Sequence, residues 1–190
     1  MVFTSGATEA AALACAGRDL RGSSTEHDAV DAWLVGEGQD VVQLANSETG
    51  VIKELPENLW LCDATQAWGK IPVAFNWLGA TCALASAHKL GGPKGIGALL
   101  VRRGTELASR LKGGGQEMGR RAGTENVIGI AGFGAAAAIA QRDLEAGLWE
   151  QVEKLRTILE KGIAAASDQT IFVGNESRRL PNTSCFATPG

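Results

Sequence analysis

A lysine just before a glycine-rich turn is the feature of this sequence with the clearest chemical meaning. Lys89 lies in the run SAHKLGGPKGIG at residues 86–97. An amine that bonds covalently to an aldehyde must be held rigidly and partly desolvated, so that its neutral form is accessible. The glycines and Pro93 predict a backbone turn beside it. The run therefore fits a Schiff-base lysine, although a surface lysine before a loop has the same local sequence.

An acid and an amide stand together upstream of this lysine. Asp63 and Gln66 occur in LCDATQA at 61–67, where we expect a strand to end. A carboxylate facing a pyridine nitrogen keeps that nitrogen protonated, and a nearby amide can donate to the ring's phenolic oxygen, which is what pyridoxal phosphate requires. The spacing also fits a helix N-cap with its partner at N3, so both interpretations stay open.

The first residues predict a phosphate-binding helix start. VFTSGATEA at 2–10 has a β-rich entry, a glycine turn and an alanine-rich helix that we expect to begin around Thr8. Free backbone N–H groups and the positive end of the helix dipole attract a phosphate there, and Thr8 adds a hydroxyl. A Ser/Thr cap followed by Glu9 also occurs in helices without ligands.

Several blocks together resemble the cysteine desulfurases, which are class V, fold-type I pyridoxal-phosphate enzymes. The blocks are TSGATEA at 4–10, TEHDAV at 25–30, LANSETGVI at 44–52, CDATQAWGKIPV at 62–73, SAHKLGGPKGIGALLVRRG at 86–104, GGGQEMGRRAGTENVIGIAGFGAA at 113–136 and LPNTSCFATPG at 180–190. They are collinear with the family across nearly the whole chain. The resemblance implies pyridoxal 5'-phosphate as cofactor and conversion of L-cysteine to L-alanine, with sulfur passed to an enzyme cysteine for iron–sulfur cluster assembly.

The resemblance also implies roles for individual residues. Lys89, His27 and His88 form the implied catalytic set, with Lys89 bonded to the cofactor and the His27 ring stacked on the pyridine. Histidines at these places could also be a polar surface group and a half-buried structural group. The implied cofactor-binding residues are Ala7, Thr8, His27, Asp63, Gln66, Ser86, His88, Lys89 and Thr124.

Within that set, the resemblance assigns the phosphate to Ala7, Thr8 and Ser86, the ring nitrogen to Asp63 and the ring oxygen to Gln66. Thr124 is the residue that reaches the phosphate of a partner subunit. A homodimer is therefore implied, because each site needs a residue from the other chain. A sulfur-acceptor protein is the other implied partner.

The sequence departs from the family in three respects. Ser47 stands where the family has a second asparagine, and a hydroxyl cannot offer an amide's two donors. The stretches from His27 to Asn46 and from Gly50 to Asp63 are short, so we expect at least one crossover to be an irregular loop. No segment resembles the family's C-terminal loop that carries the nucleophilic cysteine and a carboxylate-binding arginine.

These departures leave three functional alternatives. The chain is a cysteine desulfurase whose turnover is in doubt, another class V lyase such as a selenocysteine lyase, or a remnant that folds or dimerises without chemistry. The cysteines do not decide between them. Cys185 follows a strand-like segment, so we expect a structural thiol, and no spacing among the four cysteines resembles a metal site.

Composition and periodicity predict the architecture. A chain of 190 residues with 45% hydrophobic content and a net charge of −3 is expected to be one globular domain that binds neither nucleic acid nor membrane. Apolar strand-like runs alternate with helical patterns, which indicates an α/β fold with a mainly parallel sheet flanked by helices. Residues 1–190 are expected to form a single, incomplete cofactor-binding large domain, with the family's small C-terminal domain missing.

Two further helices are expected after this sheet. The 14-residue apolar run from Val127 to Ala140 is shorter than a membrane span and predicts a buried helix. Residues Asp143 to Ala165 have apolar positions at three-to-four-residue steps, which indicates an amphipathic helix. No secretory signal precedes Val2, so we expect a cytoplasmic protein with reduced thiols.

Overall fold

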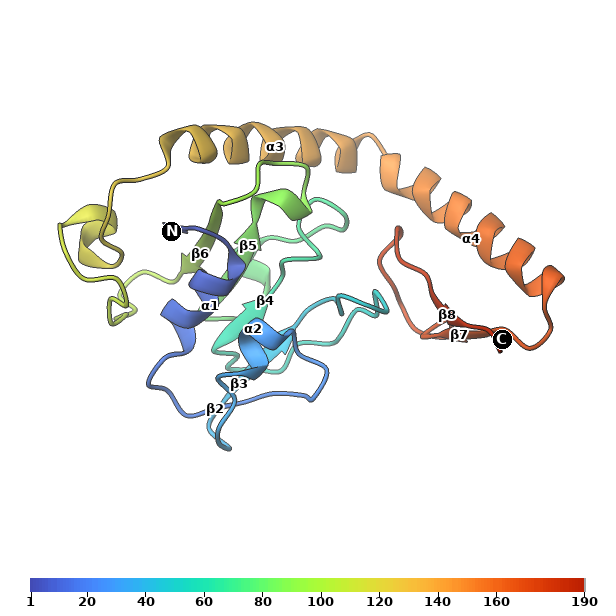
Figure 1. The fold of residues 1–190 in the computed structure, drawn as a ribbon, viewed down its shortest axis with the longest axis horizontal. Helices are drawn as coiled ribbons and strands as arrows, with labels where there is room; N and C mark the ends of the chain where they lie inside the picture. The colour runs from blue at the N-terminus through green and yellow to red at the C-terminus, as the bar shows by residue number, and fades with distance from the viewer. Residues whose placement is uncertain (190) are drawn as a thin grey trace.

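A six-stranded sheet organises the first hundred residues of the computed structural model, which describes residues 1–189 (Figure 1). In spatial order its strands are β1 (Val2–Thr4), β6 (Gly97–Val101), β5 (Cys82–Ser86), β4 (Leu61–Asp63), β3 (Gln39–Gln43) and β2 (Leu20–Arg21). Strands β2 to β5 pair in parallel, and β6 is antiparallel to β1 and β5. The predicted α/β class with a mainly parallel sheet is confirmed.

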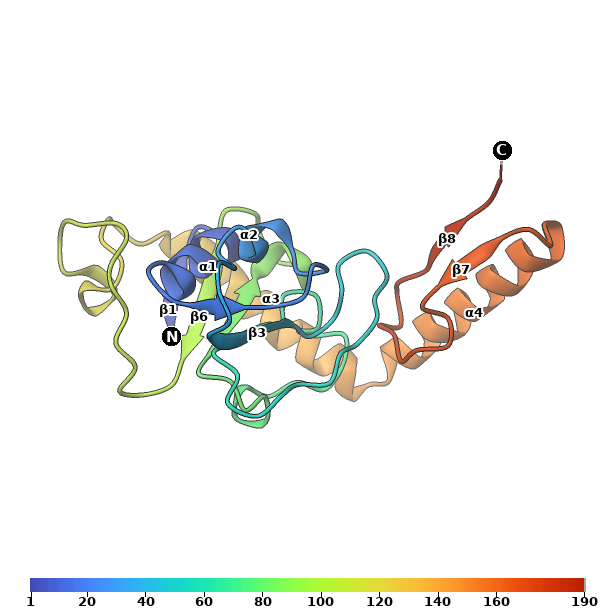
Figure 2. The same cartoon turned by 90° about the horizontal axis from the view of Figure 1, so that it is seen from below.

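Helices cover both faces of this sheet. Every residue of β5 is buried, as expected for a strand enclosed on two sides. Leu84 of β5 belongs to the cluster that packs under α1 (Ala7–Cys15), whereas its neighbour Ala85 packs with Phe133 of α3 (Val127–Glu145). Alternate side chains of one strand therefore meet different helices. Figure 2 shows the chain from below, with α4, β7 and β8 to the right of the sheet.

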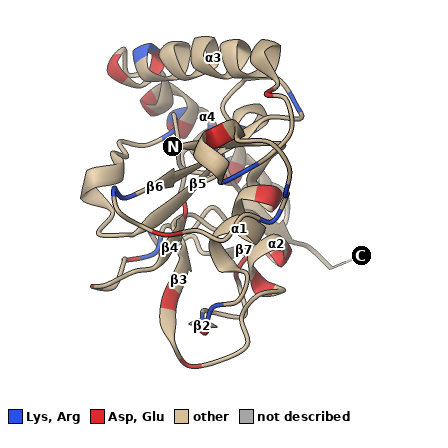
Figure 3. Cartoon of the chain, turned by 90° about the vertical axis from the view of Figure 1, so that its left-hand side faces the viewer, with Lys and Arg blue, Asp and Glu red and all other residues tan. Residues whose placement is uncertain are grey.

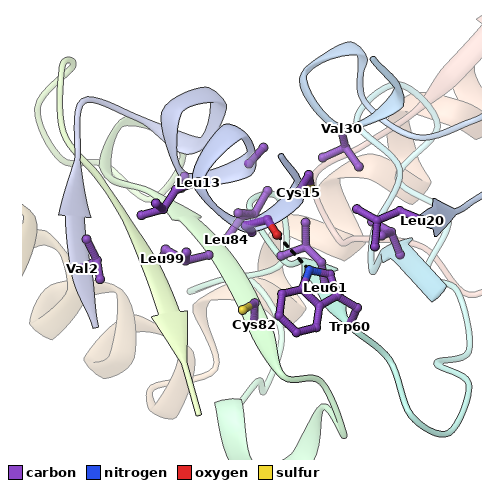
Figure 4. Packing of buried hydrophobic residues seen from close by; sticks show 14 residues of the cluster. Val2, Leu13, Cys15, Leu20, Val30, Trp60, Leu61, Cys82, Leu84 and Leu99 are labelled. Atoms are coloured by element: carbon purple, nitrogen blue, oxygen red, sulfur yellow. Dashed lines mark hydrogen bonds between the residues drawn. The ribbon is translucent and has the colours of Figure 1, made fainter. Parts of the chain in front are cut away.

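The larger core cluster fixes α1 on the sheet (Figure 4). The indole Nε1 of Trp60 donates a 3.0 Å hydrogen bond to the carbonyl oxygen of Ala14, and the Arg18 guanidinium lies 3.6 Å from the centre of the Trp60 ring. A buried indole needs such a partner because its N–H cannot reach water. Small residues such as Ala10 let the helix approach closely, so the start of α1 is held in a fixed place above the sheet.

The connection from β3 to β4 is an irregular loop, as predicted. Residues 44–60 contain no helix, and an isolated bridge between Ala45 and Ile52 joins two parts of the loop. The turn within them depends on Asn46, whose Oδ1 accepts hydrogen bonds from the backbone N–H groups of Glu48 and Thr49 at 3.0 and 2.9 Å. An asparagine side chain that replaces a backbone partner in this way stabilises a tight turn.

The remaining short elements lie between the strands. They are α2 (Asp28–Asp31), the 3₁₀ turns η1 (Phe75–Trp77), η2 (Ala87–Lys89) and η3 (Gln116–Gly119), and the strands β7 (Ile171–Val173) and β8 (Cys185–Ala187). Strands β7 and β8 pair with each other, apart from the main sheet (Figure 1). Arg179 joins them to the β3–β4 loop through an antiparallel bridge with Val51.

The two long helices differ from the prediction in their burial. Helix α3 begins after Asn126, which caps it by accepting from the N–H of Gly129 at 3.0 Å, and continues to Glu145. Only Gly129, Phe133 and Ala136 of α3 are buried, and Ile128 is 87% exposed. The prediction of a buried helix was wrong, because the strands that α3 crosses cover only one narrow stripe of it.

Gly147, in the left-handed conformation with φ of 72°, separates α3 from α4 (Leu148–Ala166). Helix α4 is amphipathic as predicted, but none of its residues is buried. Helix α3 is long and apolar enough to cross a membrane, and 17% of its most apolar 18 residues are buried. One such helix is weak evidence for a membrane span, because core helices of soluble proteins have the same length and composition. Lys and Arg are interspersed with Asp and Glu along the chain (Figure 3).

Candidate cofactor site

A cavity of about 90 Å³ lies where the parallel strands end. Gln43, Asp63 and Ser86 are the last residues of β3, β4 and β5, and all three face this cavity although they are only 2%, 4% and 1% exposed. Ligands of open α/β sheets bind at this edge, because the loops that leave the carboxyl ends of the strands meet there. The lining residues are Ala7, Thr8, His27, Ala29, Gln43, Asp63, Thr65, Gln66, Leu84, Ser86 and Lys89.

The start of α1 forms one wall of the cavity. Gly6 precedes the helix without a side-chain cap, and Ala7 and Thr8 line the cavity. Gly97 of β6 makes this placement possible, since a Cβ there would lie 2.6 Å from the carbonyl carbon of Gly6. The free N–H groups of the first turn are therefore available at the cavity, as an anion site requires.

Glu9 does not oppose an anion at this helix start. Its carboxylate accepts hydrogen bonds from the backbone N–H of Ser5 at 2.7 Å and from Arg121 Nε at 2.9 Å. Burial raises its pKa, but the bonds from Arg121 and Ser5 outweigh burial and leave the pKa below its usual value. The negative charge of Glu9 is therefore paired with the guanidinium of Arg121, and Glu9 does not line the cavity.

His27 enters the cavity from the start of α2. Its Nδ1 accepts a 3.1 Å hydrogen bond from the N–H of Ala29, so the ring is the N-cap of this helix. An accepting Nδ1 must be unprotonated, which leaves the proton of the neutral ring on Nε2. The imidazole is therefore held by one nitrogen, while its face and Nε2 stay free for another contact.

Asp63 and Gln66 lie in the turn that follows β4. Asp63 Oδ1 accepts from the backbone N–H of Thr65 at 3.0 Å, which closes the turn, and no α-helix follows. Gln66 is half-buried. Its carbonyl oxygen and its Oε1 accept hydrogen bonds from Lys70 Nζ at 2.8 and 3.3 Å. The acid and amide predicted to act together therefore lie on one turn and face one cavity.

Lys89 closes the cavity at the end of η2. Its side chain also lines a neighbouring hollow of about 420 Å³ beside α3, so it stands between two open spaces. Ser86 Oγ and His88 Nδ1 lie 3.0 Å apart and share a hydrogen bond. Burial lowers the pKa of His88, and the charges of Lys89 and Lys94 lower it further, which favours the neutral ring.

Seven of the predicted site residues thus line one cavity: Ala7, Thr8, His27, Asp63, Gln66, Ser86 and Lys89. His88 does not line it and reaches it only through Ser86. Thr124 also lies elsewhere, in a hollow of about 70 Å³ with Arg121 and Asn126. Ser47 does not line the cavity either, and its Oγ lies 3.5 Å from Glu48 Oε1.

Sequence reasoning missed Gln43, Thr65, Ala29 and Leu84. Gln43 could have been found, because it is a polar residue that directly follows Val41 and Val42 at the end of a strand, as Asp63 follows Leu61 and Cys62. Thr65 Oγ1 is buried and has no hydrogen-bond partner within residues 1–189. Its neighbours in sequence give no hint of this, because burial of the hydroxyl results from the fold.

The cysteines contribute nothing to the cavity. Burial raises the pKa values of Cys15 and Cys82 to about 12 and also raises that of Cys62, so these thiols are protonated at neutral pH. Cys185 is half-buried in β8. A reactive cysteine needs an accessible site that favours the thiolate, which the three buried thiols lack.

Comparison with known proteins agrees with this geometry. The family described as aminotransferase class-V matches residues 33–190. The chain belongs to this family. It is 41% identical over 148 residues to a cysteine desulfurase of Enterobacter agglomerans, a match that covers 73% of this chain and 36% of the relative. It is 36% identical to a cysteine desulfurase of Frankia sp., a match that covers 96% of this chain and 58% of that relative.

Several solved structures share the fold of this chain. The NifS-like protein from Rickettsia africae superimposes with a TM-score of 0.88 at 27% identity, over all of this chain and 64% of that one. DndA from Streptomyces lividans gives 0.81 at 27% identity, over 95% and 65%. SspA in complex with cysteine gives 0.65 at 27% identity, over 72% and 54%. The chain spans 36% to 58% of the two desulfurases above.

The groups around the cavity fit the cofactor of this class-V family. Pyridoxal phosphate presents a phosphate, an aldehyde, a ring nitrogen and a phenolic oxygen. The cavity offers a free helix start, an amine, a buried carboxylate and an amide. The unpartnered hydroxyl of Thr65 is a further hydrogen-bonding group of the kind that a ligand satisfies.

Proposed function

We propose that this chain binds pyridoxal 5'-phosphate in the cavity at the ends of β3, β4 and β5 and serves the cysteine desulfurase reaction. The convergence of Lys89, Asp63, Gln66 and His27 on one cavity carries this proposal. These residues come from three separate segments, namely the start of α2, the turn after β4 and η2, and together they match the groups that pyridoxal phosphate presents. The cysteine desulfurases among its relatives support the choice of L-cysteine as substrate.

Each residue has a distinct task. Lys89 Nζ would hold the cofactor through its aldehyde, and Asp63 would keep the ring nitrogen protonated. Gln66 would donate to the phenolic oxygen, and the His27 ring would contact the pyridine. When bound, the cofactor supplies an electron sink for the bonding electrons of the substrate carbon. A buried carboxylate suits the task of Asp63, because its interaction with a cation is strong where water is excluded.

The phosphate is held by Ala7, Thr8 and Ser86. The N–H groups at the start of α1 and two hydroxyls can each donate to phosphate oxygens. His88, whose lowered pKa favours the neutral ring, orients the Ser86 hydroxyl through their 3.0 Å contact. Thr124 stays outside the cavity of its own chain, in keeping with a residue donated to a second copy in a homodimer.

The overall reaction converts L-cysteine to L-alanine while its sulfur joins an acceptor thiol as a persulfide. The acceptor is a cysteine outside the buried set of this chain, on a partner protein or another segment. The sulfur then serves iron–sulfur cluster assembly, and the protein works in the cytoplasm. Two alternatives keep the cofactor site but change the outcome: a chain that binds cofactor without turnover, and another class V lyase.

Visible absorbance tests the proposal. The chain is purified with pyridoxal phosphate, and its spectrum is recorded beside Lys89→Ala and Lys94→Ala, since Lys94 is exposed on the same loop and does not line the cavity. We expect the band of lysine-bound cofactor in the wild type and in Lys94→Ala, and its loss in Lys89→Ala. No band in the wild type, or a band that survives in Lys89→Ala, would refute the site.

Alanine release from L-cysteine with a reducing thiol then tests the reaction. Alanine formed by the wild type but not by Lys89→Ala supports the desulfurase function. A visible band without alanine would retain the cofactor site and replace the enzyme by a cofactor-binding protein. Alanine from selenocysteine but not from cysteine would favour the lyase alternative.

A further inference from the structure

Lys70 is a buried lysine for which the proposed chemistry has no task. It is 7% exposed, and within residues 1–189 it forms no ion pair. Its Nζ donates instead to two oxygens of one residue, the carbonyl oxygen of Gln66 at 2.8 Å and Gln66 Oε1 at 3.3 Å. A buried lysine without an ion pair is unusual, because lysines are seldom buried unless they are paired.

The bond to the carbonyl oxygen alone could be structural. An ammonium that caps the end of a turn satisfies a carbonyl that the turn leaves free. The bond to Oε1 is different, because it constrains a side chain that need not be constrained for the turn to form. Gln66 lines the cofactor cavity, and Lys70 lies behind it, outside that cavity and beside a second hollow.

The chemistry of an ammonium decides how the amide is oriented. An ammonium has three donors and no acceptor, so it can face only the oxygen of the amide and never its NH₂ group. With Oε1 held by Lys70, the NH₂ group of Gln66 is the end left to donate into the cavity. If Lys70 were absent, either end of the amide could face the cavity.

We propose that Lys70 is a positioning residue that fixes the amide of Gln66 with its NH₂ group toward the cavity. There the NH₂ group meets a ligand oxygen that accepts a hydrogen bond. Identifying that acceptor as the phenolic oxygen of pyridoxal phosphate rests on the proposed function. The orientation of Gln66 itself does not, and it can be measured in the chain without cofactor.

The cofactor-free test is nuclear magnetic resonance of ¹⁵N-labelled chain. The side-chain NH₂ signals of Gln66 are assigned by their loss in Gln66→Glu. We expect Lys70→Met to move these signals to the positions of a freely exposed glutamine, and Lys94→Met to leave them unchanged. Gln66 signals that are the same in Lys70→Met and in the wild type would overturn the proposal, whether or not the cofactor binds.

The second test is a double-mutant cycle for cofactor binding. Loss of one oriented hydrogen bond weakens binding by about fivefold to tenfold, so we expect Lys70→Met and Gln66→Ala each to raise the Kd of pyridoxal phosphate by that factor. Because Lys70 acts through Gln66, the double variant should bind like Gln66→Ala. Its visible band should also coincide with that of Gln66→Ala.

The outcomes separate this inference from the proposed function. Effects of the two substitutions that multiply in the double variant would show that Lys70 acts independently of Gln66, and would overturn the inference while the cofactor site stands. A lower melting temperature of Lys70→Met with unchanged Kd and band would reduce Lys70 to a structural group. No band in the wild type would remove the cofactor, and the resonance test then decides alone.

Discussion

Replacement of Glu26 tests how the segment before His27 is held at the site. The side chain of Glu26 is fully buried. Its Oε2 accepts from the backbone N–H of Gln43 at 2.5 Å, and its Oε1 accepts from Lys53 Nζ at 2.8 Å. Two loops and the end of β3 therefore meet at one carboxylate. We expect Glu26→Gln to destabilise the fold, although it preserves the shape of the side chain.

The size of the stability loss in Glu26→Gln follows from the two groups that donate to the Glu26 carboxylate. The carboxylate of Glu26 accepts twice, but an amide has one oxygen and one NH₂ group, so either Gln43 N–H or Lys53 Nζ must face a donor. Hydrogen bonds to charged groups contribute about 1.5–3 kcal/mol, and breaking a buried ion pair costs about 3–5 kcal/mol. Lys53 is 24% exposed and can turn to water, so we expect a loss of roughly 2–4 kcal/mol.

Thermal and urea unfolding, followed by circular dichroism, measure this loss. For a chain of this size roughly 2–4 kcal/mol lowers the Tm by about 4–16 °C. The matched control is Arg21→Gln, which breaks the exposed ion pair with Asp40 and should leave the Tm unchanged. Lys53→Met removes the opposing donor, so the double variant should lose less than the sum of the single changes. A Glu26→Gln protein with the Tm of the wild type would refute the buried ion pair.

Two further predictions concern pH. Burial lowers the pKa of Lys70 from 10.5 to about 8, so between these pH values the unfolded chain binds a proton that the folded chain lacks. The free energy of unfolding of the wild type, relative to Lys70→Met, should therefore rise by up to about 3 kcal/mol from pH 8 to 10.5. Urea titrations at each pH measure this rise. Burial raises the pKa values of Cys15 and Cys82 from 9 to about 12. Above pH 9 the unfolded chain therefore releases protons that the folded chain keeps. The free energy of unfolding should fall by up to about 1.4 kcal/mol per pH unit for each thiol. Cys82→Ala should fall less steeply, and equal slopes in wild type and variant would contradict this.

The sequence allowed prediction of those site residues whose position follows from a strand end. Asp63 closes an apolar run where a strand end was expected, whereas Ser86 was implied by the family resemblance. Parallel strands bring the carboxyl ends of β4 and β5 to one edge of the sheet. The irregular β3–β4 connection was also predicted, from the short stretch between Gly50 and Asp63. Gln43 obeys the same rule but was overlooked.

Other features depend on contacts that a local pattern does not record. Lys70 has the sequence context of an ordinary surface lysine, and only the folded turn buries it. The apolar run of α3 predicts burial, but the amount of burial depends on what packs against the helix, and here the strands reach only Phe133 and its neighbours. Periodicity shows which face is apolar and leaves open what covers that face.

The structural and functional interpretations of the site residues are compatible, because they use different atoms. Asp63 closes its turn with Oδ1 and retains Oδ2, and His27 caps α2 with Nδ1 and retains its ring face and Nε2. Gln66 is held through its oxygens and retains its NH₂ group. A side chain fixed by one atom loses little further freedom when another atom binds a ligand. The capping bonds that seemed to compete with a cofactor site in the sequence are therefore what would make such a site rigid.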